Sequence, residues 1–457
     1  MKKLMTHAVL LLSVGVTARA EPMRSGIWKS VGYAEVLVVG DGQYTFYDVT
    51  RATCVEREHG VINPTEPYFP SVTYPSAEKM VVEGSSYRYS LLKMDTLPEA
   101  CTVKRQPPDA LETFDAFWSY LDENYAGFKA RGIDWHAVRT RYRPRVTTTT
   151  TESELYATLG EIVAMINDPH VFVSNRKQGV GAVLLSARDL HGIARVVAVA
   201  QPGHEDSFYH RASHRIEEGI EALIRYEVLG GRFKTAFNDK LTWGMLDPNV
   251  AYLRASAFVG LFTGMKRDDM LPALEAKLDE AFGDFKDARA LVIDVSTNTG
   301  GAGFIPAAIA RRIIREPKVA WTKRARANGG LSEDVFTMRI EPSVSTRFTG
   351  PVVILMSNNS VSSGEELPLI LKGLPYVTLF GDTSPGALSD IQMKSLPNGG
   401  VLGLPNEVVM SADGENYDAR GIAPDVRTSV FDPAKPLSGY TRTLAAAASL
   451  AARMALR

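Results

Sequence analysis

Short runs of apolar residues, separated by Gly, Pro and Asp, dominate the chain as far as about residue 105. The runs at 34–39, 44–49 and 86–92 are rich in aliphatic and aromatic residues. Runs of this length with turn-forming residues between them predict β-strands. We therefore expect residues 21–105 to form a small β-rich N-terminal domain.

The spacing of the apolar positions changes to that of a helix beyond residue 108. Five apolar side chains recur at spacings of three or four residues: Phe114, Phe117, Trp118, Leu121 and Tyr125. That spacing places them on one face of an α-helix. A second amphipathic helix is expected to begin near 151–153 and to reach Ile166, because Thr and Ser suit a helix start. The two patterns predict a helical subdomain over residues 106–175.

A third pattern begins at residue 249, where strand-like apolar runs alternate with helical segments. The strand-like runs are 250–253, 290–295, 352–356 and 376–380, and the helical segments are 270–282, 304–314 and 364–371. This alternation predicts an α/β core over residues 249–435, with a mixed sheet covered by helices. A C-terminal helix is expected at 436–457. Residues 176–248 lack a clear pattern, and we expect an irregular insertion there.

The first twenty residues carry the three parts of a secretory signal peptide. Lys2 and Lys3 make a basic start, residues 8–16 are apolar, and small residues precede a cleavage site expected after Ala20. A buried N-terminal helix would not need this order. We therefore expect a periplasmic or secreted protein. No later segment reaches the roughly 18 apolar residues that span a bilayer, so we expect no membrane span after signal cleavage.

Composition and charge narrow the possible partners. Lys and Arg number 51 and Asp and Glu number 52, so the net charge of −1 creates no overall field for nucleic acid or an anionic membrane. Cys54 and Cys101 are the two cysteines. Export favours a disulfide between them, and two free thiols are the alternative. Two cysteines without nearby paired histidines make a weak metal site, and we expect neither a metal nor a cofactor.

Candidate chemistry lies where two predicted strands end. The first strand leads into a turn that contains Gly300 and Gly301, where exposed N–H groups could receive an anion or simply close a tight turn. The second strand leads to Ser360, Ser362 and Ser363 directly before a helix. Serine there could be presented at the carboxyl edge of the sheet or could cap the helix.

A serine nucleophile needs a base within hydrogen-bond reach. None of the eight histidines lies beyond His214, so a histidine base has to come from the N-terminal half of the chain. His170 has the most suggestive setting, because it follows Pro169 at the end of an amphipathic helix, and proline would end that helix. A structural role is the commoner one for any single histidine.

Taken together, these segments resemble the C-terminal-processing (tail-specific) serine protease family, and its tricorn-core-like branch more than its Ser/Lys branch. The resemblance covers roughly residues 110–175 and 249–430. Four blocks in the same order carry it: Phe117, Trp118, Tyr125 and Trp135 leading to Asp168, Pro169 and His170; Ile293, Asp294 and Val295 with Asn298, Gly300 and Gly301; Ser360, Val361, Ser362 and Ser363 with Glu365; and 381–386 with Gly414, Asp418, Gly421, Pro424 and Asp425.

The resemblance implies a ClpP/crotonase-like core and assigns roles to single residues. Ser362 falls on the nucleophile, His170 on the general base and Asp418 on the third member of the triad. Backbone N–H groups of Gly301 and Ser363, beside Gly300, fall near the oxyanion hole. Should Asp418 not orient His170, Glu415 and Glu365 are the next candidates.

Two positions depart from the family pattern. Ala387 stands where the Ser/Lys branch has its lysine base, and Ser296 replaces the usual arginine of the oxyanion turn. No convincing PDZ domain follows the helical subdomain. The resemblance therefore implies an exported serine peptidase that acts on polypeptides through an acyl-enzyme on Ser362. A non-catalytic ligand- or peptide-binding relative and an esterase for small acyl substrates are the alternatives, and the oligomeric state stays open.

Overall fold

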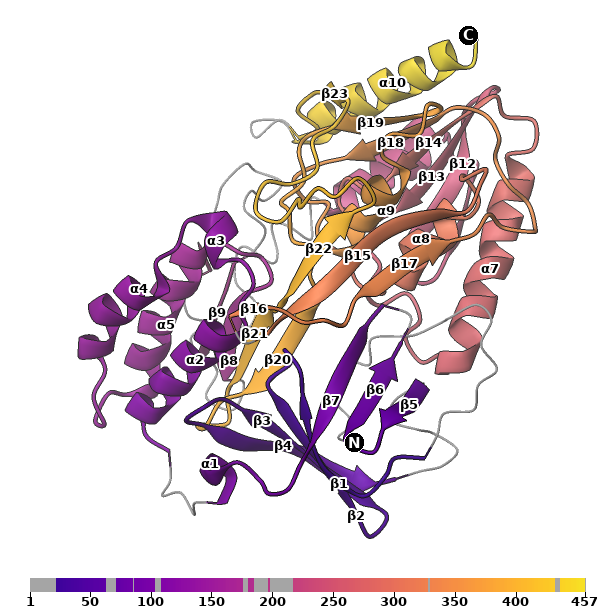
Figure 1. Ribbon diagram of the computed structural model, residues 1–457. Helices are drawn as coiled ribbons and strands as arrows, with labels where there is room; N and C mark the ends of the chain where they lie inside the picture. The colour runs from indigo at the N-terminus through magenta and orange to yellow at the C-terminus, as the bar shows by residue number, and fades with distance from the viewer. Residues whose placement is uncertain are drawn as a thin grey trace.

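The computed structural model describes residues 22–62, 71–84, 86–102, 108–175, 180–184, 196–197, 217–327, 329–431 and 436–456. The expected signal peptide at 1–20 lies outside these residues, as does much of the expected irregular insertion at 176–248. The N-terminal sheet lies at one end of the molecule and the C-terminal helix at the other (Figure 1). Over the part of the chain that the structure describes, no helix is both long and apolar enough to span a bilayer.

The N-terminal domain is one antiparallel sheet of seven strands in the order β4-β3-β2-β1-β7-β6-β5. The strands are β1 (Gly26–Ser30), β2 (Glu35–Gly40), β3 (Gln43–Val49), β4 (Cys54–Val61), β5 (Ser71–Ser76), β6 (Lys79–Glu83) and β7 (Arg88–Met94). Trp28, Leu37, Phe46 and Met80 are buried together in its core. The predicted β-rich region is therefore confirmed.

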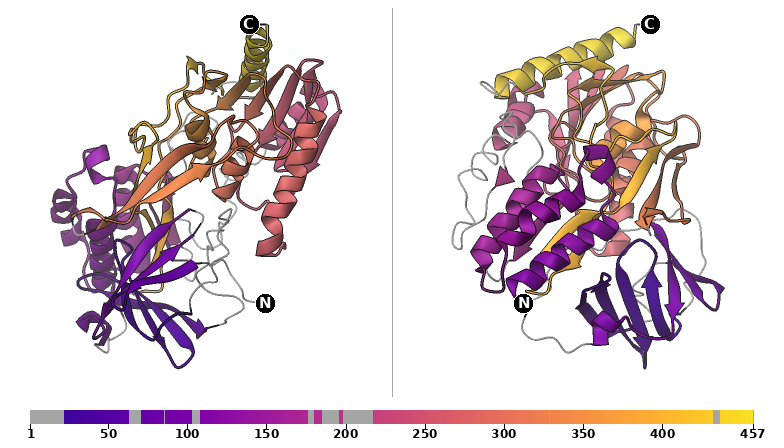
Figure 2. Two further views of the ribbon diagram at one scale, coloured as in Figure 1. Left: turned by 45° about the vertical axis from the view of Figure 1, so that its right-hand side comes forward. Right: turned by 60° about the vertical axis from the view of Figure 1, so that its left-hand side comes forward.

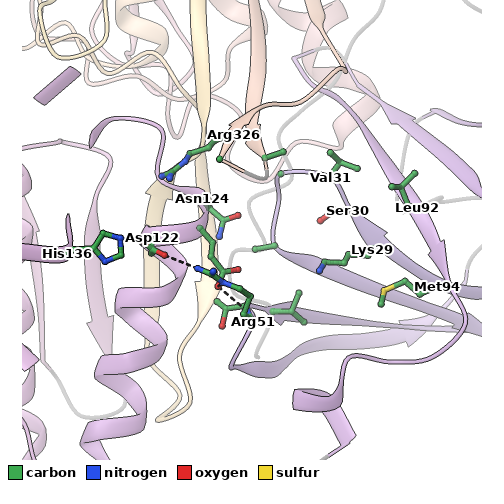
Figure 3. Close-up of a pocket in the computed structure, with 17 residues that line it drawn as sticks. Lys29, Ser30, Val31, Arg51, Leu92, Met94, Asp122, Asn124, His136 and Arg326 are labelled. Atoms are coloured by element: carbon green, nitrogen blue, oxygen red, sulfur yellow. Dashed lines mark hydrogen bonds and ion pairs between the residues drawn. The ribbon is translucent and has the colours of Figure 1, made fainter. Parts of the chain in front are cut away.

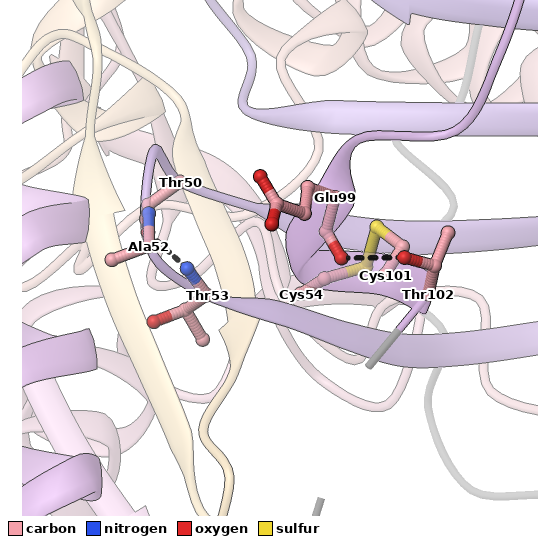
Figure 4. Close-up of a disulfide and its surroundings, with 7 residues drawn as sticks. All are labelled: Thr50, Ala52, Thr53, Cys54, Glu99, Cys101 and Thr102. Atoms are coloured by element: carbon pink, nitrogen blue, oxygen red, sulfur yellow. Dashed lines mark hydrogen bonds between the residues drawn. A yellow bond between two sulfur atoms is a disulfide. The ribbon is translucent and has the colours of Figure 1, made fainter. Parts of the chain in front are cut away.

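A disulfide between Cys54 and Cys101 closes this domain, 47 residues apart in sequence (Figure 4). Cys54 begins β4, and Cys101 lies in the short helix α1 (Glu99–Thr102). The bond fixes the end of the domain to its own sheet just before the chain continues toward the helical subdomain.

The helical subdomain contains α2 (Ala110–Asn124), α3 (Phe128–Arg131), α4 (Trp135–Tyr142), the short 3-10 turn η1 (Arg143–Arg145) and α5 (Glu152–Ile166). The Asp109 side chain caps the start of α2. Thr151 and Glu154 form a reciprocal capping box at the start of α5, which satisfies otherwise unpaired N–H groups. The predicted apolar stripes of both helices are buried in one cluster.

A small sheet links this subdomain to the C-terminal part of the chain. Its order is β10-β9-β8-β21-β20. The strands are β8 (Phe172–Asn175), β9 (Val180–Leu184), β10 (Val196–Val197), β20 (Ile391–Ser395) and β21 (Val401–Pro405). Because β21 pairs with β8, a segment more than 200 residues downstream completes the sheet that follows α5.

The core is a second seven-stranded sheet in the order β11-β12-β13-β14-β18-β19-β23. Its strands are β11 (Phe233–Ala236), β12 (Leu241–Asp247), β13 (Val250–Ala255), β14 (Ala290–Asp294), β18 (Val352–Met356), β19 (Val377–Gly381) and β23 (Val426–Arg427). The pairs from β13 to β23 are parallel and those from β11 to β13 antiparallel, so the predicted mixed sheet is confirmed. Strands β11 and β12 belong to this sheet although they precede residue 249; the π-helical turn η2 (Leu223–Val228) comes before them.

Helices cover both faces of the core sheet. Residues of α7 (Arg267–Asp284), α8 (Phe304–Ala310) and α9 (Ser363–Leu371) share one buried cluster with Leu291 and Ile293 of β14. Residues of α10 (Pro436–Met454) pack with Val292 on the opposite face. Every β14 residue is buried, as expected for a strand between two helical layers.

A four-stranded sheet connects the core to the N-terminal domain. It contains β15 (Lys318–Ala327), β16 (Gly330–Leu331), β17 (Phe336–Ile340) and β22 (Glu407–Ser411). The buried ammonium of Lys394, in the adjacent β20, donates to the Tyr33 carbonyl at 2.6 Å and contacts Asp48 at 3.2 Å. These bonds dock the N-terminal sheet against the rest of the chain. The ribbon views show this sheet at one end of the molecule, beside the helical subdomain (Figure 2).

Candidate active site

Ser362 occupies a sharp corner between β18 and α9. Its backbone has φ of 60° and ψ of −129°, a conformation that costs a residue with a side chain about 1–3 kcal/mol. The same kind of strained strand-to-helix turn exposes the nucleophile of α/β-hydrolases. Ser362 is only partly buried, whereas Ser360 and Ser363 on either side are buried. The corner therefore presents the hydroxyl of Ser362 and not those of its neighbours.

Two glycines bring the turn after β14 against this corner. A Cβ on Gly300 would lie 2.7 Å from the Ser362 Cβ and 3.2 Å from its Oγ. A Cβ on Gly301 would lie 2.1 Å from the backbone of Phe258. Their φ values of 95° and 137° are also unsuited to other residues. Glycine is thus required at both positions by backbone conformation and by close approach.

The predicted oxyanion donors lie beside Ser362, but two of them already have partners. The Gly301 N–H donates to the Ser363 hydroxyl at 2.9 Å, and that hydroxyl donates back to the Gly301 carbonyl at 2.8 Å. The Gly300 N–H donates to the Asn298 side chain at 2.9 Å. The Ser363 N–H has no partner among the residues described. The N–H groups of Gly300 and Gly301 are therefore already occupied by hydrogen bonds within the site.

His170 lies just beyond α5, where the helix ends at Asn167 in the left-handed conformation. Its backbone N–H donates to the Asp168 carboxylate at 2.9 Å. Its imidazole donates to the backbone carbonyl of Ser389. Burial lowers the pKa of His170 below its ordinary value, and the nearby Asp168 carboxylate opposes that effect. Burial, which disfavours the charged ring, is therefore the larger of the opposing influences on this pKa.

Asp418 lies in the same pocket as His170, a cavity of about 20 Å³ that also contains Asp168 and Arg131. Its carboxylate accepts the N–H of Leu388 at 3.3 Å. Burial raises the pKa of Asp418 to about 7. Within the described part of the chain, no hydrogen bond joins the His170 ring to Asp418 or to Ser362. The structure therefore brings His170 and Asp418 into one pocket without a hydrogen bond between them.

Glu365 is the carboxylate that contacts the nucleophile segment directly. It accepts the N–H of Ser362 at 3.1 Å, that of Gly386 at 2.8 Å and that of Ala387 at 2.9 Å. A hydrogen bond from the side chain of Ser384 also contributes to its electrostatics. The sequence placed Glu365 in the nucleophile segment, but its contacts with 384–387 had no sequence signal.

Arg254 braces the oxyanion turn, a role that the sequence did not reveal. Ser296, which replaces the family arginine, is fully buried and its hydroxyl has no hydrogen-bond partner. Arg254, from the adjacent strand, instead donates to Asp294 at 3.1 Å and to Thr297 at 2.7 Å. Tyr440 of α10 also donates to Asp294. The one available signal was a charged residue inside an otherwise apolar strand.

A buried ionic cluster lies behind the His170 pocket. The Lys323 ammonium contacts Asp390 and, at 2.9 Å, Glu407, and Tyr33 of the N-terminal domain donates to Glu407 at 2.6 Å. Glu407 also lines the pocket that contains His170. The N-terminal domain therefore reaches the wall of the candidate active site through Tyr33.

A much larger cavity, of about 730 Å³, lies between the N-terminal sheet and the helical subdomain (Figure 3). Lys29 and Leu92 line one side and Asp122 and His136 the other, with Arg51 bonded across to Asp122 at 2.9 Å. None of the predicted site residues lines it. The larger of the two cavities is therefore not the one that contains the predicted active-site residues.

Two family models match the chain. The peptidase family S41 model matches residues 249–428, and the tricorn protease C1 domain model matches residues 107–164. Together with the fold, they define a serine-type peptidase. The chain belongs to the C-terminal-processing protease family, as its four sequence blocks predict.

Individual relatives are more distant. The nisin-resistance protein of Lactococcus lactis subsp. lactis is 33% identical over 79 residues, which are 17% of this chain and 25% of that protein, so the match spans a quarter of that relative. A protein from Parabacteroides merdae assigned as a peptidase shares the fold with a TM-score of 0.58 and 22% identity, over 75% of this chain and 96% of its own. Mature CPAF in complex with lactacystin has a TM-score of 0.52 and 13% identity, over 76% and 98%. These structural likenesses concern the fold alone.

Proposed function

We propose that this protein is an exported serine peptidase that hydrolyses peptide bonds through an acyl-enzyme on Ser362. The observation that carries the proposal is the presentation of Ser362 at a strained strand-to-helix corner with Gly300 against its side chain. That corner lies inside the segment that matches peptidase family S41. Polypeptide is the substrate class that the family suggests.

In the proposed mechanism, His170 takes the proton of the Ser362 hydroxyl as that oxygen attacks the scissile carbonyl. With one ring nitrogen donating to the Ser389 backbone carbonyl, the other would be free to accept the proton. Backbone N–H groups of Gly301 and Ser363 receive the oxyanion, and the protonated His170 then delivers its proton to the leaving amine. Water repeats the cycle on the acyl-enzyme.

Asp418 is the proposed third member. A carboxylate in the pocket of His170 stabilises the imidazolium that forms during attack. Ser362 does not line that pocket, so Ser362 and His170 have to approach one another to form a hydrogen bond, as catalytic groups often do when substrate binds. The same movement would release the Gly301 N–H from Ser363.

Labelling by a fluorophosphonate, followed by digestion and mass spectrometry, tests the nucleophile. Wild-type protein should be modified at Ser362, and Ser362→Ala should not be labelled. Ser360→Ala is the matched control, because that hydroxyl is buried two residues away and bonded to the Val295 carbonyl at 2.8 Å. Labelling that survives in Ser362→Ala would overturn the proposal, and absent labelling of the wild type together with tight ligand binding would favour a non-catalytic binder. A panel of peptides and small esters then separates a peptidase from an esterase.

A further inference from the structure

The Glu365 carboxylate connects the Ser362 corner to the segment that contains Gly386 and Ala387. One carboxylate oxygen accepts the N–H of Gly386, and the other accepts those of Ala387 and Ser362. The Ser384 side chain contributes a fourth hydrogen bond. Glu365 is fully buried, so none of these bonds competes with water.

These contacts exceed what a helix cap requires. Glu365 stands at the third position of α9, and its bond to the Ser362 N–H is half of a capping box. A capping box involves only the first turn of a helix. The bonds to Gly386 and Ala387 instead reach a separate segment, more than 20 residues downstream, which leads within three residues to the Ser389 carbonyl that receives the His170 ring.

We propose that Glu365 is the positioning residue that holds the strained Ser362 backbone and the His170-facing segment 384–389 in one fixed arrangement. The proposal rests on the proposed role of Ser362 as nucleophile. Glu365 acts through the backbone of Ser362 and does not touch the substrate. All four groups around Glu365 donate hydrogen bonds to it, and an ionised carboxylate, which only accepts, suits such a setting.

A glutamine at this position has nearly the same volume but one acceptor oxygen and one NH₂ group. The NH₂ group would face backbone N–H donors, so part of the clamp would become a donor–donor contact. The Ser362 corner would then relax from its strained conformation or move relative to Ser389. A displacement of about 1 Å at a catalytic group can cost about 100-fold in rate.

The neighbouring Glu366 provides a matched control. It is also buried, burial raises its pKa to about 8, and its carboxyl group makes no hydrogen bond to any described residue. Glu366→Gln therefore makes the same side-chain substitution in the same turn of α9 without removing a clamp. Ser384→Ala serves as a milder variant, because it deletes only one of the four bonds to Glu365.

The experiment measures the second-order rate of fluorophosphonate labelling at Ser362, and kcat and KM on a peptide, well below each variant's Tm. Glu365→Gln should lower the labelling rate and kcat about 100-fold with KM nearly unchanged, and Ser384→Ala should lower them about fivefold, the value of one hydrogen bond. Glu366→Gln should retain the wild-type rate.

Wild-type labelling in Glu365→Gln, or an equal loss in Glu365→Gln and Glu366→Gln, would overturn the proposal. If Glu365→Gln does not fold, an unchanged rate in Ser384→Ala overturns it instead. Failure of the proposed function looks different, because labelling would then survive in Ser362→Ala whatever happens at Glu365.

Discussion

The hydroxyl of Ser363 accepts the N–H of Gly301 at 2.9 Å and returns a hydrogen bond to the Gly301 carbonyl at 2.8 Å. Gly301 supplies one of the proposed oxyanion donors, so its N–H is occupied by the residue next to the proposed nucleophile. An oxyanion has to displace the Ser363 hydroxyl before it can use this donor. The described structure is therefore a resting arrangement of the proposed site.

Ser363→Ala should speed acylation of Ser362. Removing the competing hydroxyl frees the Gly301 N–H, and one neutral hydrogen bond of about 1 kcal/mol corresponds to about a fivefold faster labelling rate. The same change should lower the free energy of unfolding by about 1 kcal/mol. Quenched time courses of fluorophosphonate labelling measure the rate of acylation, and thermal unfolding measures the change in stability. A tenfold slower rate would instead mean that the hydroxyl holds Gly301 in its working position.

The pH dependence should reflect a histidine whose pKa is lowered by burial. Neutral His170 is the active form, so kcat/KM should hold down to pH 6.5 and decline only below it. A depressed pKa also contributes stability that is present above the unfolded pKa of about 6.5 and is lost as pH falls through the folded pKa. His170→Gln should therefore show a smaller loss of Tm between pH 7.5 and 5. A rate profile flat to pH 4 would contradict an imidazole base.

Asp418→Asn should separate chemistry from stability. Because the pKa of Asp418 is raised to about 7, its contribution to stability is present below the unfolded pKa of about 3.9 and is lost as pH rises through 7. The neutral amide should thus raise Tm at pH 8 and leave it nearly unchanged at pH 4. Turnover should fall strongly, since a neutral amide cannot balance the charge of the imidazolium that forms during attack. Near-wild-type turnover would assign that role to another group.

Arg254 and Asp294 should show strong coupling in a double-mutant cycle. Both are buried, and Arg254→Met would leave the Asp294 carboxylate without its cation, a loss of about 3–5 kcal/mol in unfolding free energy. Asp294→Asn in the same chain should recover part of that loss, because it removes the unpaired charge. Denaturant unfolding of the two single variants and the double variant measures the coupling. Additive effects would mean that the pair does not brace the turn.

Reduction of the Cys54–Cys101 bond should destabilise the N-terminal domain. Its sequence separation of 47 corresponds to about 4 kcal/mol of loop-closure entropy in the unfolded chain. Unfolding with and without reductant checks this value, with Cys54→Ala/Cys101→Ala as the control that should be insensitive to reductant. Intact mass of protein recovered after export should show loss of residues 1–20. Two free thiols in that protein would contradict the expected oxidising compartment.

Sequence patterns predicted the fold because its elements have strong local signals. The stripe of Phe114, Phe117 and Leu121 lies buried in α2 as expected, and the apolar runs of β14 and β18 are adjacent central strands. Strands β11 and β12 were missed as parts of the core sheet, since an antiparallel edge with polar residues lacks the uniform apolar character of the parallel strands.

The sequence could predict a candidate site residue only where the pattern of the residues around it, such as the end of a strand, marks its position. Ser362 and Gly300 follow buried strands, so strand ends pointed to them. The carbonyl of Ser389, the brace from Arg254 and the clamp by Glu365 depend on which distant segments become neighbours. A backbone carbonyl has no residue signature at all, so the sequence could not point to Ser389.

The pairing of β8 with β21 has a consequence for the folding of this protein during its synthesis. His170 lies directly before β8, and Val173 of that strand pairs with Leu402. The ribosome therefore makes Ser362 and His170, the proposed nucleophile and base, before it makes the strand that pairs with β8. A nascent chain that stops short of residue 401 would carry both groups and could not assemble them. The order of synthesis alone would thus delay cleavage until almost the whole polypeptide exists.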